Sequence, residues 1–397
     1  MSQHSRSSIL TYQGIPLWRD VRVLRAVAQV VSAVIVITFV VFFVRNVLGA
    51  AERRGLALGF DFLNEAAGFP IAESAIPYTE ANSFQYAFWV GILNTLKVAL
   101  VGILLATILG TIVGVSRLSS NWLISKLAST YIEIIRNVPL LVQLFFWYFA
   151  IFQKLPRVQD SIRWPGPLYL SNRGVYMVWA KPSPTFRHWI FYVLAGLLLA
   201  TVLGIVLTRY QMRTGRSTYP ILSAGIVLLL IPALGWLMVD QSPLIREVPA
   251  MGRFNFQGGL RMTPEFASLL AGLVLYTASF IAEIVRAGIM AVPRGQVEAA
   301  RAVGLSYLQT LRLVILPQAM RVVIPPLISQ YLNLTKNSSL AIAIGYPDLF
   351  SVGRIMINQG GRAVPTFIMI MVAYLAMSLT YAIIGNIYNR RMRFAER

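Results

Sequence analysis

The chain of 397 residues is 57% hydrophobic and only 13% charged, with a mean hydropathy of +0.66, so it is more apolar and less charged than a soluble domain. Its 35 Lys and Arg residues exceed its 15 Asp and Glu residues, but most lie in short connections between apolar runs, where they orient membrane spans, and nucleic-acid binding is not expected. The absence of Cys and the presence of only His4 and His188 exclude disulfides, thiol chemistry and a Cys/His metal site.

Apolar runs long enough to cross a bilayer recur along the whole chain. A hydrocarbon core of ~30 Å needs ~20 apolar helical residues. The sequence therefore predicts an all-α integral membrane protein with about eight transmembrane helices. The first run is interpreted as a retained anchor, because Leu48 stands where a signal peptide needs a small residue before cleavage. The runs are 27–48, 86–115, 128–151, 188–207, 220–239, 265–290, 319–343 and 365–388.

The loop charges predict that both termini are cytoplasmic. The long loop 51–85 is acidic and typical of an external segment, whereas the short loop "TRYQMRTGRST" and the C-terminal "NRRMRFAER" are basic without compensation. One loop, 152–187, is expected outside although it is basic. Its length and its proline content reduce its weight in setting the orientation.

A polar stretch, "RGQVEAARAVGLSYLQTLRLVILP", follows the sixth apolar run. The segment 296–303 suits a short helix, and Gly304 fits the left-handed residue that ends it. Ser306 and Gln309 have the spacing of a capping box that starts a second helix, and Pro317 is expected to stop that helix. Such short helices are unstable alone, so this elbow needs a packing partner. These residues do not decide whether that partner is the rest of the chain, lipid head groups or another protein.

The same stretch resembles the EAA loop of ABC-importer permeases. That pattern is E-A-A, three residues, Gly, nine residues, Ile, any residue, Leu and Pro, and this chain departs from it only at Val314. In the family, the elbow is the cytoplasmic coupling helix, which sits in a cleft of the ATPase. The resemblance therefore implies an ATPase-coupling role for Glu298, Ala299, Ala300, Gly304, Leu308, Leu311 and Pro317.

Further motifs narrow the resemblance to polar amino-acid permeases of the histidine and glutamine importer type. They are "IEIIRNVPLLVQLFFWYFA", "YTASFIAEIVRAGIMAVPRGQVEAARAVGLS" and "LPQAMRVVIPPLISQYLNLTKNSSLAIAIG". The resemblance implies a type I importer core of five helices, and the layout resembles the larger permease subunits of general L-amino-acid importers. The expected parts are a cytoplasmic tail 1–26, an extra span with a periplasmic loop 27–85, a first core part 86–151, an insertion with two extra spans 152–263, a second core part 264–390 containing the EAA loop 293–318, and a cytoplasmic tail 391–397.

The resemblance also implies the partners. It predicts a bacterial inner-membrane subunit of an ATP-driven amino-acid importer, with a cytoplasmic ABC ATPase dimer that binds ATP and Mg, a periplasmic amino-acid-binding protein, surrounding membrane lipid and a second, related permease in a heterodimer. The chain itself has no Walker-type G-x-x-x-x-G-K-[ST], so it is expected to be no enzyme and to bind no cofactor. An ion-coupled secondary transporter or channel is the alternative, but it would not need an exposed elbow.

Charged residues within the apolar runs are candidates for the translocation path or its gate. Glu283 and Arg286 share one helical face, which favours an ion pair over direct substrate contact. Arg136 and Asn137 come early in the third run. We expect them near the cytoplasmic side, in a structural or gating role.

A third polar group follows two consecutive prolines in the seventh run. These side chains could line a cavity for zwitterionic amino acids, or they could satisfy backbone groups freed by Pro325 and Pro326, and the sequence leaves both interpretations open. The group comprises Asn333, Lys336, Asn337, Ser338 and Ser339.

Overall fold

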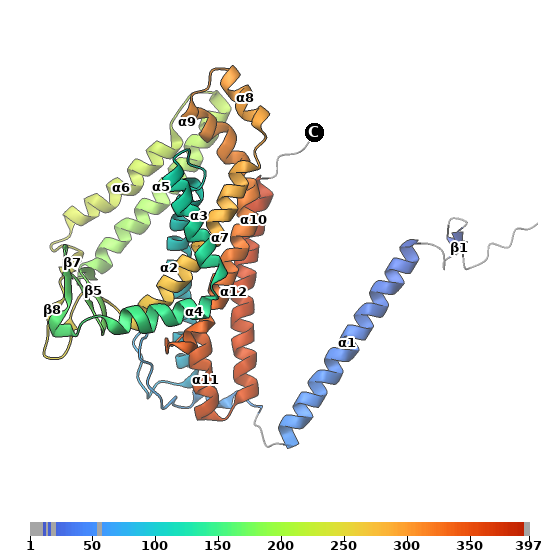
Figure 1. The fold of residues 1–397 in the computed structure, drawn as a ribbon, viewed down its shortest axis with the longest axis vertical. Helices are drawn as coiled ribbons and strands as arrows, with labels where there is room; N and C mark the ends of the chain where they lie inside the picture. The colour runs from blue at the N-terminus through green and yellow to red at the C-terminus, as the bar shows by residue number, and fades with distance from the viewer. Residues whose placement is uncertain (1–10, 13–14, 17–20, 54–57, 393–397) are drawn as a thin grey trace, which may run out of the picture.

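The computed structural model describes residues 11–12, 15–16, 21–53 and 58–392, so parts of the predicted tails 1–26 and 391–397 lie outside the described residues. It is mainly helical (Figure 1). The helices are α1 Val21–Arg53, α2 Phe84–Ser116, α3 Trp122–Asn137, α4 Leu140–Phe145, α5 Phe186–Thr214, α6 Pro220–Met238, α7 Pro264–Met290, α8 Arg294–Ala302, α9 Tyr307–Thr310, α10 Leu316–Asn337, α11 Leu349–Gly360 and α12 Ala363–Met392.

The number of spans agrees with the sequence. Among the described residues, seven helices are long and apolar enough to cross a membrane, and a bent pair brings the number to eight if it counts as one span. The all-α fold with about eight transmembrane helices is therefore confirmed for the membrane part of the chain.

The third predicted span is broken instead of straight. Helix α3 begins earlier than predicted, where the Asn121 side chain accepts hydrogen bonds from its first turn, and the chain bends by 103° before continuing into α4. Pro139 has no N–H to continue α3, and Val138 is extended. The Gln143 amide donates to the carbonyls of Ile135 (2.9 Å) and Val138 (3.0 Å), which satisfies part of the broken end.

The prediction that Pro317 stops the second elbow helix is wrong. Helix α9 continues through a π-helical segment, Leu311–Ile315, into α10, and the whole stretch forms one span. Pro317 lies in the first turn of α10, where its missing N–H is tolerated because the π-helical turn has already changed the hydrogen-bond register. The Gln318 amide donates to the carbonyl of Val314 (3.1 Å).

Small residues bring α2 and α7 into close contact at the centre of the bundle. A Cβ at Gly110 would lie 2.8 Å from the carbonyl oxygen of Ala278, and one at Gly114 would lie 2.5 Å from that of Ala282. Such backbone approach is the usual basis of helix packing in lipid. Helix α10 packs against α7, and α12 packs against α10, so these four helices form the central bundle (Figure 1).

Helices α5 and α6 form an antiparallel hairpin beside this bundle (Figure 1). They meet closely near the end that carries the strands, where the Trp189 indole donates to the carbonyl of Pro232 (2.9 Å). A Cβ at Gly235 would lie 2.4 Å from the ring of Tyr192. Most other large apolar side chains of this hairpin are exposed, as expected for a surface that faces lipid.

The segments flanking this hairpin form small antiparallel sheets that the sequence analysis did not predict. Tyr176, Phe256 and Val158 make a compact core beneath them. Since β10 leads directly into α7 and the far end of α7 leads to α8, the sheets and the elbow lie at opposite ends of the molecule (Figure 1). The four-stranded sheet has the order β10 (Leu260–Met262), β5 (Gly174–Met177), β4 (Leu168–Ser171) and β3 (Ile162–Trp164). Beside it, β6 (Trp179–Pro182) pairs with β7 (Leu244–Glu247), and β8 (Ala250–Met251) pairs with β9 (Phe256–Gln257). A separate pair, β1 (Thr11–Tyr12) and β2 (Ile15–Pro16), precedes α1.

Candidate functional site

The elbow between α8 and α9 has the local structure that its residues dictate. Gly304 adopts a φ of +82°, which confirms the predicted left-handed position. Its N–H donates to the carbonyl of Arg301 (2.9 Å), and the N–H of Leu305 donates to the carbonyl of Ala300 (3.1 Å). These bonds satisfy carbonyls that would otherwise be free at the end of α8.

The predicted capping box at the start of α9 is confirmed. The Ser306 hydroxyl accepts from the backbone N–H of Gln309 (3.4 Å), and the Gln309 side-chain oxygen accepts from the N–H of Ser306 (2.8 Å). Both ends of the elbow are therefore fixed by short-range hydrogen bonds, which holds two short helices at a defined angle without a large core.

The outer surface of the elbow is apolar and faces away from the rest of the chain. Val303, Tyr307 and Leu308 are 78%, 73% and 71% exposed. Val303 and Tyr307 were missed by the sequence analysis, although the former directly precedes Gly304. Of the predicted coupling residues, Glu298, Ala299, Gly304 and Leu308 are exposed, Ala300 is buried, and Leu311 and Pro317 are half-buried.

Within the membrane part, Glu283 pairs with two arginines. The guanidinium of Arg286 donates to one carboxylate oxygen of Glu283, with Nε at 3.2 Å, which confirms the predicted ion pair. Arg117, just past the end of α2, donates to the other oxygen. Arg117 was not predicted from the sequence as a partner of Glu283. The only signal for Arg117 in the sequence is that this residue ends a long apolar run.

A polar cavity of about 350 Å³ lies beside this cluster. Arg136 stacks over the ring of Phe280 at 4.9 Å from its centroid. Because α3 starts at Trp122, Arg136 lies about 21 Å along the helix, and Phe280 precedes the C-terminal end of α7 by about 15 Å. This contact therefore joins the last turn of α3 to the interior of α7. The cavity is lined by Arg117, Ile132, Glu133, Arg136, Asn137, Phe280 and Glu283.

The polar group on α10 divides into two sets. The hydroxyls of Ser338 and Ser339 donate back to the carbonyls of Thr335 and Lys336, both at 2.8 Å, where α10 changes into a 3₁₀ helix. The other set, Asn333, Lys336 and Asn337, projects from one face of α10, where Asn333 and Lys336 are exposed.

The side chains of this second set have no hydrogen bond or ion pair within the part of the chain that the structure describes. A lysine in a membrane-spanning helix must meet water or a polar partner, because an isolated charge in hydrocarbon is too costly. This face of α10 therefore requires a polar environment that the chain itself does not provide.

A second ion pair lies in the N-terminal half of α2, and sequence reasoning did not find it. Lys97 Nζ is 2.7 Å from Glu73 of the loop that precedes α2 and 4.4 Å from the centroid of the Phe266 ring. The Thr263 hydroxyl, which caps α7, also donates to Glu73. Beside them, the buried Asn94 amide donates to the carbonyls of Glu73 and Pro347, both at 2.8 Å. These bonds fix this loop against α2 and α7.

Asp348 is buried at the start of α11, at the end of the bundle opposite the elbow (Figure 1). It caps α11 by accepting from the N–H of Ser351 (2.9 Å), and the Tyr374 hydroxyl donates to its other oxygen (3.3 Å). The carboxyl is fully buried, and this burial raises the pKa of Asp348 above its ordinary value.

Comparison with known proteins gives a consistent family. Residues 200–394 match the family described as binding-protein-dependent transport system inner membrane component. The chain is 45% identical to the putative amino-acid ABC transporter permease protein YhdX of Escherichia coli strain K12, over 93% of this chain and 94% of that one. It is 43% identical to the general L-amino acid transport system permease protein AapQ of Rhizobium johnstonii, over 93% and 92% of the two chains. A solved structure described as an amino acid ABC transporter with histidines is 22% identical, with a TM-score of 0.47, over 78% of this chain and 95% of that one.

Proposed function

The chain belongs to the permease subunits of binding-protein-dependent amino-acid importers. From this membership we propose a role in transport for each group of site residues. It is a multi-pass inner-membrane subunit and no enzyme, because the ATPase of such importers is a separate subunit. ATP and Mg bind to that ATPase dimer, and this chain binds no cofactor of its own. A periplasmic binding protein delivers the amino acid.

The elbow transmits the movement of the ATPase. The observation that carries this proposal is the apolar surface formed by Val303, Tyr307 and Leu308, which has no covering element in the described chain although both ends of the elbow are rigidly capped. A rigid, exposed apolar elbow fits a cleft on a soluble partner. Nucleotide-driven closure of the ATPases then shifts the spans between inward-facing and outward-facing states.

The unpaired face of α10 and the cavity beside Glu283 form parts of the translocation path. Lys336 attracts the carboxylate of an amino acid, and Asn333 and Asn337 offer hydrogen bonds to it. Arg136 and Asn137 line the cavity at the broken third span and act as its gate, while Glu283 neutralises Arg117 and Arg286. A zwitterion crosses only where opposite charges replace its water.

The importer contains this chain and a second, related permease as a heterodimer. Each chain offers a single elbow, so two permeases serve the two ATPases. A segment of 82 residues is 49% identical to the inner membrane amino-acid ABC transporter permease protein YhdY of Escherichia coli strain K12, which shows that related permeases share local sequence. Both termini are cytoplasmic; for the C-terminus, this is supported by the end of α12 lying toward α8 in Figure 1.

Affinity purification of the tagged chain from membranes, with Gly304→Val and Gly304→Asn in parallel, tests this assignment. At φ +82° a β-branched residue is strained by ~1–2 kcal/mol, whereas Asn tolerates this conformation, and a new Cβ at this position meets no atom within 4 Å. We expect the wild type and Gly304→Asn to recover an ATPase and a second permease, and Gly304→Val to lose the ATPase.

A chain that purifies alone in all three forms would contradict the importer. Uptake driven by an ion gradient without ATP would then point to a secondary transporter or channel, which none of the comparisons favours.

A further inference from the structure

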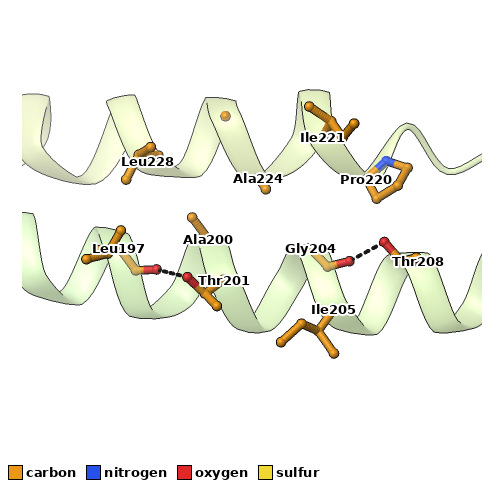
Figure 2. A pocket seen from close by; sticks show the side chains of 11 residues that line it. Leu197, Ala200, Thr201, Gly204, Ile205, Thr208, Pro220, Ile221, Ala224 and Leu228 are labelled. Atoms are coloured by element: carbon orange, nitrogen blue, oxygen red, sulfur yellow. Dashed lines mark hydrogen bonds between the residues drawn. The ribbon is translucent and has the colours of Figure 1, made fainter. Parts of the chain in front are cut away.

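A lateral groove runs between the two helices of the α5–α6 hairpin (Figure 2). Its volume is about 510 Å³, within the ~300–1,000 Å³ of ordinary small-molecule sites. On α5 it extends from Leu197 to Thr208, which corresponds to about 16 Å along the helix axis. The groove opens toward the end of the hairpin that carries the α5–α6 turn, and this turn lies at the same end of the molecule as α8 and α9 (Figure 1).

Small side chains form the floor of the groove, where the two helices touch. Ala200 and Ala224 point toward the facing helix (Figure 2), and a Cβ at Gly204 would lie 3.5 Å from that of Ala224, whereas one at Gly225 would meet no atom within 4 Å. The two threonine hydroxyls in the wall do not make it polar. Thr201 and Thr208 each donate to a carbonyl of their own helix at 2.7 Å, so the groove offers an apolar surface.

The turn end of the α5–α6 hairpin, beyond the groove, is cationic and carries aromatic residues. Arg209, Arg213 and Arg216 are exposed, and none has an ion pair among the described residues. No Asp or Glu occurs from 186 to 239, so no acidic residue of the hairpin balances them. Tyr210 and Tyr219, 47% and 67% exposed, stand at the same level and are typical of a membrane–water interface.

We propose that this groove binds one acyl chain of an anionic phospholipid whose phosphate contacts Arg209, Arg213 and Arg216. The groove length of about 16 Å matches one leaflet, which is about half of a ~30 Å hydrocarbon core. An anionic head group complements three unpaired arginines, and an acyl chain complements the apolar wall. Assigning the lipid to the cytoplasmic leaflet rests on the proposed function, because that assignment orients the elbow.

A transmembrane helix of a partner does not fit the same space. A helix about 10 Å across would need roughly 1,250 Å³ over 16 Å, more than twice the volume of the groove. An acyl chain is thin enough to lie in the groove along the seam where Gly204 and Ala224 meet. It would cover both helices at once and hold the turn end of the hairpin together.

Lipid binding can be measured on the intact importer complex, purified in mild detergent and stripped of loosely bound lipid. Phosphatidylglycerol or phosphatidylcholine is titrated in, and native mass spectrometry reports the lipid bound per complex. We expect wild type to bind phosphatidylglycerol more tightly than phosphatidylcholine. Since each arginine near an anionic head group contributes about fivefold, replacing Arg209, Arg213 and Arg216 with Gln should lower the affinity for phosphatidylglycerol roughly hundredfold.

The apolar half of the site has a matched control. Ala224→Leu fills the groove and should lower the affinity for both lipids at least tenfold, whereas Ala233→Leu, an exposed site outside the groove on the same helix, should leave binding unchanged. Arg187→Gln, at the opposite end of α5, is the control for charge. The three arginines of the turn are exposed, so their replacement tests the site even if Ala224→Leu does not accumulate.

Two results would overturn the proposal. If Ala224→Leu binds lipid as tightly as wild type, no acyl chain occupies the groove. If the Ala224→Leu complex loses the second permease but keeps its lipid, the groove is a protein interface. The same spectra report whether the ATPase remains bound, so failure of lipid binding is distinguishable from failure of the importer assignment.

Discussion

Replacing Glu283 with Gln removes the carboxylate that Arg117 and Arg286 share. The three side chains are 27%, 24% and 26% exposed, so the cluster is neither a surface pair nor fully buried. A surface pair contributes ~0–1 kcal/mol, and loss of one partner from a buried pair costs ~3–5 kcal/mol. We expect Glu283→Gln to lower the free energy of unfolding by about 2 kcal/mol. Arg117→Gln should cost about 1 kcal/mol, because Glu283 keeps Arg286.

Thermal unfolding of the purified complex in one detergent measures this difference. A loss of about 2 kcal/mol corresponds to a fall in Tm of about 4 °C for a large domain. The double variant Arg117→Gln/Glu283→Gln should cost about 1 kcal/mol less than the sum of the single variants, because both remove the same interaction. Glu133→Gln is the matched control. It changes an exposed wall residue of the same cavity that has no ion pair in the described chain, and it should cost under ~0.5 kcal/mol.

Additive effects, or equal effects of Glu283→Gln and Glu133→Gln, would refute this reasoning. Glu283 would then not hold the arginines together, and its carboxylate would be available for direct contact with the ammonium group of a substrate.

Three further predictions concern other parts of the chain. Glu298→Lys reverses the charge of an exposed side chain midway along α8, so substrate-stimulated ATP hydrolysis should fall several-fold while Glu298→Gln stays near wild type; unchanged hydrolysis would exclude Glu298 from coupling. Lys336→Met should reduce uptake at least tenfold with the complex intact, whereas Lys336→Arg should retain most of it; normal uptake by Lys336→Met would remove this face from the path. Burial raises the pKa of Asp348 in the folded state, so folding favours the protonated carboxyl. The resulting contribution to the free energy of unfolding is full below the unfolded-state pKa of about 3.9, and it is lost as the pH rises through the folded-state pKa. Asp348→Asn keeps the cap and should gain Tm relative to wild type as the pH rises, and parallel Tm profiles of the two proteins would contradict this.

The sequence determined the features that depend on neighbouring residues. Span length follows from the number of consecutive apolar side chains, which predicted about eight crossings. The elbow follows from Gly304, which reaches φ +82° without the strain that a Cβ-branched residue would have, and from the Ser306 and Gln309 pair, whose hydrogen bonds span three residues. The break of α3 was within reach of the same reasoning, because Pro139 stands inside the run. The stop expected at Pro317 failed because the π-helical turn before it removes the conflict.

Only the tertiary structure decided which distant residues meet. Arg117 reaches Glu283 across 166 positions because Gly110 and Gly114 let α2 approach the backbone of α7, and no local pattern specifies that neighbour. The same applies to Asn94, whose amide donates to the carbonyl of Pro347 across 253 positions. Helix packing also decided that Lys336 finds no partner in the described chain and that a groove runs along the seam between α5 and α6. A sequence specifies which side chains are charged or small, but their neighbours depend on how the helices pack.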